Sequence, residues 1–145
     1  MRAEQSPNDP KYPAYRAFDG LIGLDTSYSA THAGKNEPHW LKATFYHRVF
    51  ISEIKLVNRM EAHMQILNNG LKMSTSVRDQ DGKLSVIKEI LDLGALGDQK
   101  TFQWNEKADV LMIEKPLLKD TNVDWASVVL SLDEVFIHGY ILLDA

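Results

Sequence analysis

Apolar residues at alternate positions, in short segments separated by turn residues, constrain the fold of this chain more than any other feature. In residues 49–56, Phe50, Ile54 and Leu56 fall on even positions, and Ser52 is the one polar break. A strand with one buried face has this period, because successive side chains point to opposite faces of the sheet. Five further segments are rich in β-branched, aromatic and aliphatic residues and predict strands: residues 40–46, 71–77, 109–113, 127–132 and 135–143.

Turn residues occupy several of the gaps between these segments. Residues 68–70 read Asn-Asn-Gly and residues 79–82 read Asp-Gln-Asp-Gly, sequences that adopt positive φ at low cost. His47 and Arg48 are predicted to lie in a hairpin turn. Residues 86–93 are ambiguous, because their apolar side chains would line one face of a short helix as well as a strand. Many short strands at regular spacing predict a β-sandwich or jelly roll.

The composition excludes several classes of function. At 145 residues the chain forms one domain, residues 1–145, with a single core. The net charge is -4 and the lysines are scattered, which argues against nucleic acid as a partner. No run approaches ~18 consecutive apolar residues, so no helix is predicted to span a membrane. No nucleophile elbow, metal-protease helix or phosphate loop occurs, so we expect a binding protein rather than an enzyme.

The cysteine count and the N-terminus bear on the compartment. The chain contains no cysteine, so no disulfide can stabilise it. This fits a reducing compartment, and it equally fits an extracellular domain that is large enough to fold without a disulfide. The domain pattern begins almost at residue 1 and no apolar signal segment precedes it, so we expect a module of a longer protein.

The longest irregular stretch runs over residues 19–40 and is rich in Gly, Ser, Thr, Asn and Pro. A loop of this length in a compact domain needs something to organise it. Calcium can do so, because this hard cation takes about six to eight oxygen ligands, many of them backbone carbonyls.

Several short motifs stand in a fixed order along the chain. His32 and Arg59 are separated by 26 residues, and Glu61 follows Arg59 after one intervening residue. Four segments accompany them: residues 17–20 (Ala-Phe-Asp-Gly), 38–40 (Pro-His-Trp), 51–59 and 130–139. In this order and spacing the chain resembles the F-type lectins (fucolectins), within the discoidin or coagulation factor 5/8 type C superfamily. The resemblance implies an all-β, eight-stranded jelly-roll β-sandwich with Trp40 in its core.

The resemblance also implies a calcium site (Ca2+). Six residues would offer oxygen atoms to the ion, namely the carboxylates of Asp19 and Glu134, the carbonyls of Arg16, Leu21 and Asp133, and the hydroxyl or carbonyl of Ser29. The alternative is that Asp19 only opens a turn before Gly20 and that Glu134 lies on a solvated strand face.

The sugar site that the resemblance implies is incomplete. His32 and Arg59 match two of its hydrogen-bonding residues, and Glu61 stands where the family prefers Asp. Ile66 occupies the position of a further Arg or Lys. A hydrogen bond to a charged group contributes ~1.5–3 kcal/mol, so we expect fucose binding of the usual type to be lost. The alternatives are that Ile66 belongs to the core and that His32 hydrogen-bonds only within its own loop.

Three classes of function compete. The first is a calcium-stabilised, lectin-like carbohydrate-binding module with a degenerate fucose motif, whose partner is a glycan or glycoprotein. The second is a cell-adhesion or protein-interaction module that kept the fold and lost sugar binding. The third is phosphatidylserine binding, which needs apolar residues flanked by basic ones; Leu21 and Ile22 are flanked by Asp19 and Asp25, so membrane lipid is not the expected partner. We expect an extracellular location, and the oligomeric state stays open.

Overall fold

The computed structural model describes residues 1–23, 27–32, 37–116 and 129–143. These ranges contain six strands, which are β1 (Arg2–Ser6), β2 (His39–Val57), β3 (Lys72–Arg78), β4 (Leu84–Ile90), β5 (Gln99–Lys115) and β6 (Glu134–Ile141). They also contain three short helices, which are η1 (Ala14–Phe18), α1 (Ala62–Gln65) and η2 (Ile66–Asn68). Within the described residues, no helix is long and apolar enough to cross a membrane.

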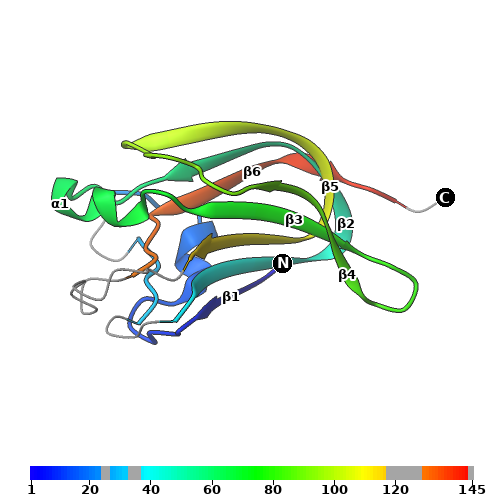
Figure 1. Ribbon diagram of the computed structural model, residues 1–145, viewed down its shortest axis with the longest axis horizontal. Coiled ribbons are helices and arrows are strands. Elements are labelled where there is room, and N and C mark those ends of the chain that lie inside the picture. Colours follow the sequence, from blue (N-terminus) through cyan, green and yellow to red (C-terminus); the bar gives the residue numbers. More distant parts are fainter. Residues whose placement is uncertain (24–26, 33–36, 117–128, 144–145) are drawn as a thin grey trace.

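Two long strands, β2 and β5, bend and contribute to both layers of a sandwich (Figure 1). The first part of β2 pairs with β1, and its second part pairs with β6. β5 pairs antiparallel with both parts of β2, while β3 pairs with the second part of β5 and β4 pairs with β3. One layer therefore contains β1, β3, β4 and one part each of β2 and β5, and the other contains β6 and the remaining parts of β2 and β5. The described residues form six strands where eight were expected, because β2 and β5 each serve both layers. The expected all-β sandwich is confirmed.

The bend of β2 corrects one expectation. Residues 40–46 and 49–56 were expected as separate strands with His47 and Arg48 in a hairpin turn, but β2 runs through all of them. The pairing of β2 with β5 is interrupted between Thr44 and Val49, which is an irregularity of the bulge type. A bulge bends a strand without ending it, so one strand can pass from one layer to the other.

Two other segments also differ from the simple pattern. The ambiguous residues 86–93 lie mostly in a strand, β4, which pairs with β3 and is largely exposed. Residues 129–132 are not a strand, although they were expected to belong to one, and residues 127 and 128 lie outside the described part of the chain. This segment still pairs locally with the long loop, since Leu132 O accepts from Ser29 N at 3.0 Å and Leu130 O accepts from Thr31 N at 3.0 Å.

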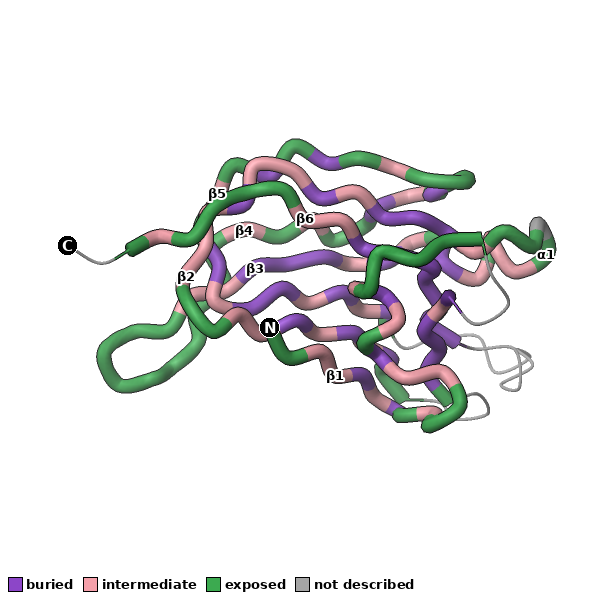
Figure 2. The backbone as a smooth tube through the Cα atoms, turned by 180° about the vertical axis from the view of Figure 1, so that it is seen from behind, coloured by how far each residue is buried: buried purple, intermediate pink, exposed green. Residues whose placement is uncertain are grey.

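The core lies between the two layers, where most of the buried strand residues are found (Figure 2). Its tryptophan is Trp104, and Trp40 does not belong to it. Trp104 is fully buried, and its Nε1 donates to Thr75 Oγ1 at 2.9 Å. Trp40 was expected in the core, but it is half-buried and its ring lies 5.1 Å from Lys42 Nζ. The expectation was wrong because the alternation of β2 turns Leu41 and Ala43 inward, and Trp40 falls on the opposite face.

Candidate functional site

Arg59 follows the end of β2 and is held in a fixed orientation. Its Nε and Nη2 donate to the two carboxylate oxygens of Glu61 at 3.0 and 2.9 Å. This is a bidentate pair, which fixes the plane of the guanidinium. Hydrogen bonds from Arg59 keep the pKa of the Glu61 carboxyl below its usual value, so the pair is ionised at neutral pH. The side chain of Arg59 is only 10% exposed, whereas that of Glu61 is 42% exposed.

An aromatic ring covers one face of the same guanidinium. The Cζ atom of Arg59 lies 3.7 Å from the centroid of the Tyr28 ring. Tyr28 in turn stacks on Tyr12, with centroids 5.1 Å apart and an interplanar angle of 20°. Burial raises the pKa of the Tyr28 hydroxyl, so this ring stays neutral beside the cation. Tyr12, Tyr28 and Arg59 therefore form a stack that draws on three separate segments of the chain.

A buried pair of asparagines anchors the segment that carries Arg59. Asn58 and Asn68 are both fully buried. Asn58 Oδ1 accepts from Arg59 N at 2.9 Å and from Asn68 Nδ2 at 2.7 Å, and Asn58 Nδ2 donates to Gln65 O and Gly97 O. Because buried amides are costly when unpaired, this network holds the backbone at Arg59 in one position.

The network extends to the segment before β6. Asn68 Nδ2 donates to Ser131 O, and Ser131 N donates to Asn68 Oδ1 at 3.3 Å. Ser131 Oγ donates to Ser29 O at 2.7 Å and accepts a long contact, 3.5 Å, from Arg59 Nη1. The loop of Ser29, the segment of Ser131 and the end of β2 are thus joined beneath Arg59.

Two apolar side chains lie exposed on the segments beside Arg59. Met60 is 66% exposed and Ile66 is 68% exposed. Ile66 begins η2, and the preceding Gln65 donates from Nε2 to Arg59 O at 2.9 Å, which holds the short helices against the loop of Arg59. The alternative that Ile66 belongs to the core is therefore wrong.

His32 is exposed, and the described chain stops directly after it. Its backbone N donates to Pro7 O at 2.8 Å. Tyr28, four residues earlier on the same segment, is the residue that reaches Arg59. The convergence of His32 with Arg59 on one ligand stays a prediction.

Asp19, directly after η1, lies near Glu134 at the start of β6. Glu134, at the start of β6, is 1% exposed, and its Oε2 accepts from Gly20 N at 2.9 Å. Burial, followed by the negative charge of Asp19, raises the pKa of Glu134 to about 8. The carboxyl oxygens of Glu134 and of the nearby Asp19 are of the kind that a hard cation takes as ligands.

The other predicted metal ligands have bonds of their own. Asp133 accepts from Gly23 N at 2.8 Å and from Ser27 Oγ, so its side chain orders the long loop. Ser29 is buried and bonded to Leu132 and Ser131 through its hydroxyl and carbonyl oxygens. The backbone N of Arg16 donates to Pro13 O, and the backbone N of Leu21 donates to the side-chain oxygen Asp19 Oδ1. The carbonyl oxygens of Arg16 and Leu21 stay predicted metal ligands. No three His, Cys, Asp or Glu side chains gather in a metal-binding arrangement in the described residues.

Sequence reasoning did not find Tyr12, Tyr28, Asn58, Asn68 or Ser131. A stack of two tyrosines on an arginine has no characteristic spacing, because each partner comes from a different segment. The sequence provided only a weak indication of the roles of Asn58 and Asn68. Asn58 comes just after an apolar segment, and Asn68 begins a predicted turn. Asparagine is common at such positions in loops. An asparagine that anchors a loop differs from an ordinary turn residue in being buried, which the sequence does not show.

The layers and the long loop define the galactose-binding-domain-like β-sandwich, which is the fold of F-type lectins and discoidin-like domains. One solved structure with this fold is a fucose-binding module from Streptococcus pneumoniae, which matches with a TM-score of 0.74 at 18% identity over 96% of this chain and 93% of that chain. The lectin domain of lectinolysin in complex with Lewis b antigen matches with a TM-score of 0.73 at 19% identity, over 94% of this chain and 91% of that chain.

A fucolectin from the serum of striped bass, Morone saxatilis, matches with a TM-score of 0.71 at 21% identity. The match covers 97% of this chain and 47% of that chain, so this chain spans about half of the fish protein's length. No protein-family profile matches the sequence, and no curated protein matches it significantly. The likeness to these structures confirms the expected fold.

Proposed function

We propose that this domain is a non-catalytic, lectin-like carbohydrate-binding module whose sugar site is centred on Arg59. The observation that carries the proposal is the fixed guanidinium, with Glu61 at one edge, Tyr28 on one face and Ser131 beneath. A guanidinium has five N–H donors, and these bonds use three of them. The two remaining N–H groups would donate to two adjacent hydroxyl groups of a sugar. A rigid pair of donors of this kind suits the recognition of a sugar.

The ligand that this site favours differs from free fucose. Ile66 offers no donor where the resemblance implies a cation, and its exposed side chain lies with Met60 beside the loop of Arg59. A glycan with an apolar substituent, or a sugar joined to an apolar aglycone, gains contacts there that an unsubstituted sugar does not. We infer that Arg59, with His32 and Glu61, supplies the polar contacts and that Ile66 selects the substituent.

Calcium is the proposed support of the long loop. Asp19 and Glu134 would hold the ion through carboxylates, with carbonyl or hydroxyl oxygens from Arg16, Leu21, Asp133 and Ser29. When bound, the ion supplies a positive charge that neutralises the two carboxyls and orders irregular backbone. The loop that contains Ser29 also contains Tyr28, so metal binding supports the ring on which Arg59 lies.

A glycan array, with and without chelator, tests the proposal. Arg59→Ala should lower binding to the array at least tenfold. The control Arg2→Ala, which removes an exposed arginine at the start of β1, should leave binding unchanged. Chelator should lower the melting temperature, and Asp19→Ala should remove that difference. Binding that survives Arg59→Ala would place the ligand elsewhere on the domain.

A protein-interaction module without sugar binding is the second candidate. The exposed Met60 and Ile66 favour it, because such side chains adapt to protein surfaces. This candidate predicts that the domain binds no glycan on the array. It also predicts a protein partner whose affinity for the domain falls with Ile66→Ser. In either case we propose that the domain acts outside the cell, as one module of a longer protein.

A further inference from the structure

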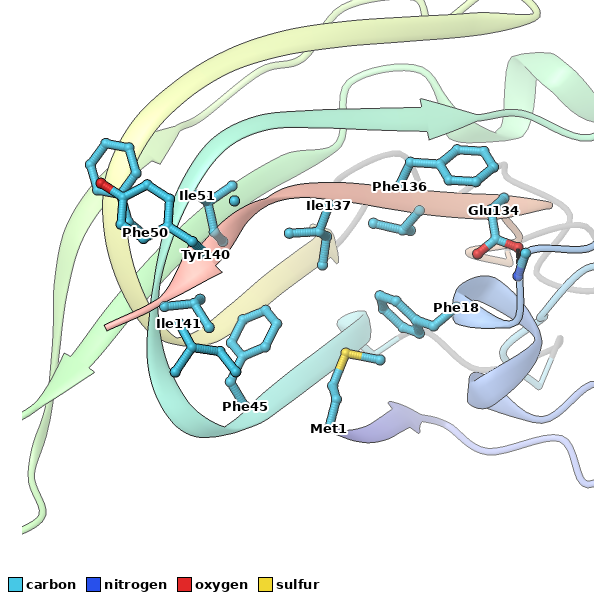
Figure 3. Close-up of a pocket in the computed structure, with 14 residues that line it drawn as sticks. Met1, Phe18, Phe45, Phe50, Ile51, Glu134, Phe136, Ile137, Tyr140 and Ile141 are labelled. Carbon is cyan, nitrogen blue, oxygen red and sulfur yellow. Dashed lines mark hydrogen bonds between the residues drawn. The ribbon is translucent and has the colours of Figure 1, made fainter. Parts of the chain in front are cut away.

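The outer face of the smaller layer carries aromatic side chains that the proposed sugar site does not use. The smaller layer consists of β6, the second part of β2 and the first part of β5. On its inner side, Ile137 of β6 points into an apolar pocket of about 390 Å³, and the ring of Phe136 lies on the opposite side of the strand (Figure 3). Because side chains alternate along a strand, Phe136, His138 and Tyr140 share the outer face.

Aromatic rings occupy both ends of this outer face. At one end the rings of Phe50 and Tyr140 stack, with centroids 5.3 Å apart and an interplanar angle of 22° (Figure 3). Tyr140 is 60% exposed, so the stack leaves much of its ring open to solvent. At the other end Lys55 Nζ lies 4.7 Å from the centroid of the Phe136 ring. Phe136 and Tyr140 are four positions apart on β6, which is about 13 Å along a strand.

A polar row lies between the two aromatic ends. In the sheet, Glu53 pairs with His138 on one side and with Gln103 on the other. Gln103 Nε2 donates to Glu53 Oε2 at 3.3 Å, and both His138 and Gln103 are exposed. The row therefore offers carboxylate, amide and imidazole groups to solvent, and these include both donors and acceptors of hydrogen bonds.

This arrangement suits a sugar chain better than a protein or a charged polymer. A protein interface has an apolar centre and a polar rim, and this face has the reverse order. A sugar ring has an apolar side that packs on an aromatic ring, and it has hydroxyl groups that bond polar side chains. Charges of both signs are present, from Glu53 and from Lys55 and the exposed Lys107, so neither a polyanion nor a polycation is favoured.

We propose that the outer face of the smaller layer is a second carbohydrate-binding surface, which holds an extended, uncharged oligosaccharide along β6. Tyr140 and Phe136 each pack against a sugar ring, and the polar row of Glu53 bonds the hydroxyl groups between them. The distance between the two rings exceeds one sugar ring, so the ligand is a chain of several units. Arg59 follows the end of β2 and contacts the long loop, so this proposal does not rest on the site of Arg59.

Affinity electrophoresis tests the proposal with four uncharged polysaccharides, namely laminarin, hydroxyethylcellulose, arabinoxylan and galactomannan. At least one of them should retard the natural protein and Arg59→Ala equally, because Arg59 is not on this face. Polygalacturonate, whose units carry carboxylates, should retard the protein less. No retardation by any of the four would overturn the proposal. Retardation that is lost in Arg59→Ala would also overturn it, because the ligand would then occupy the site of Arg59 instead.

Three variants test the role of the exposed ring. Tyr140→Ala should weaken binding to the retarding polysaccharide about tenfold. Tyr140→Phe keeps the ring and should bind as the natural protein does. Tyr15→Ala is the matched control, because Tyr15 is also 60% exposed but lies in η1, and its loss should leave binding unchanged. Equal losses from Tyr140→Ala and Tyr15→Ala would show that exposed tyrosines bind the polysaccharide non-specifically, and this face would not be the site.

The polar row and the length of the ligand are tested separately. Gln103→Ala leaves the rings in place and should weaken binding about threefold, since it removes one hydrogen-bonding group. In titration calorimetry, a hexasaccharide from the retarding polysaccharide should bind about tenfold more tightly than the disaccharide, because only the longer chain reaches both aromatic ends. Equal affinities for the two lengths would contradict a surface that runs along β6.

Discussion

The Arg59 guanidinium lies against the Tyr28 ring, 3.7 Å from ring centroid to Cζ, while its edge is held by Glu61. These two contacts fix different degrees of freedom. The bidentate pair sets the rotation of the guanidinium within its plane, and the ring sets the tilt of that plane. A side chain constrained in both ways loses little conformational entropy when a ligand binds.

Tyr28→Ala should therefore weaken glycan binding about tenfold, which corresponds to about 1.4 kcal/mol. The mutant keeps Arg59 and its charge but loses the surface on which the guanidinium lies. Tyr28→Phe keeps that surface and should bind as the natural protein does. Titration calorimetry with an array-selected glycan measures both. Equal losses in the two variants would mean that the hydroxyl, rather than the ring face, matters.

Ile66→Arg should create measurable binding of L-fucose. Ile66 is exposed at the start of η2, so a longer side chain can be accommodated there without disturbing the core. The added guanidinium restores the donor that the resemblance implies, and a charged hydrogen bond contributes ~1.5–3 kcal/mol. Titration calorimetry on the two proteins provides the comparison. If neither protein binds fucose, the loop of His32 does not complete the site.

Asn58→Ala should destabilise the domain by roughly 2–3 kcal/mol. The substitution takes the Asn58 partner from Arg59 N and from the carbonyls of Gln65 and Gly97, and it leaves Asn68 Nδ2 with its bond to Ser131 O alone. Urea unfolding measures the loss. Gln103→Ala, which removes an exposed amide on β5, is the control and should change stability by less than about 0.5 kcal/mol. A similar effect of both changes would show that the network is not a structural anchor.

In chelator, the free energy of unfolding should fall as the pH rises from about 5 to about 8. Glu134 has a pKa of about 8 in the folded protein and an ordinary value of 4.5, so the folded state binds more protons in this window. The contribution of Glu134 to stability is therefore complete below its pKa in the unfolded chain. It is lost as the pH rises through its pKa in the folded protein, and the loss amounts to roughly 2–4 kcal/mol.

Urea unfolding at a series of pH values measures this dependence. Glu134→Gln cannot titrate and should give a flat profile between pH 5 and 8. The carboxyls of Glu61 and Asp109 have lowered pKa values, so their contributions are lost only at more acidic pH. A natural protein whose profile is already flat would mean that Glu134 ionises normally.

Trp104→Ala should cost about 3–5 kcal/mol, because it empties a buried site in the core and leaves Thr75 without its indole partner. Trp40→Ala should cost far less, since Trp40 is half-buried on the outer face of β2. Chemical unfolding of the two variants gives the comparison. A larger loss from Trp40→Ala would mean that Trp40 is the main packing tryptophan, as the resemblance had implied.

The sequence by itself determined most of the strands and the class of fold. Residues 71–77 and 135–143 alternate or concentrate apolar residues, and they lie in β3 and β6 with small shifts at their ends. Such patterns are local, because each strand must turn one set of side chains to the core. The resemblance implied that Asp19 and Glu134 share a calcium site, which stays a prediction; in the structure Glu134 Oε2 accepts from the backbone N of Gly20, the residue after Asp19.

Only the tertiary structure decided which residues surround Arg59 and where the core tryptophan lies. The stack of Tyr28 on Arg59, the buried bond between Asn58 and Asn68, and the pocket beside Ile137 all join segments that are distant in sequence. No local period encodes such contacts, since they depend on the bend of β2 and on how two layers pack. The same packing turned Trp40 outward and buried Trp104, because one face of each strand must meet the other layer.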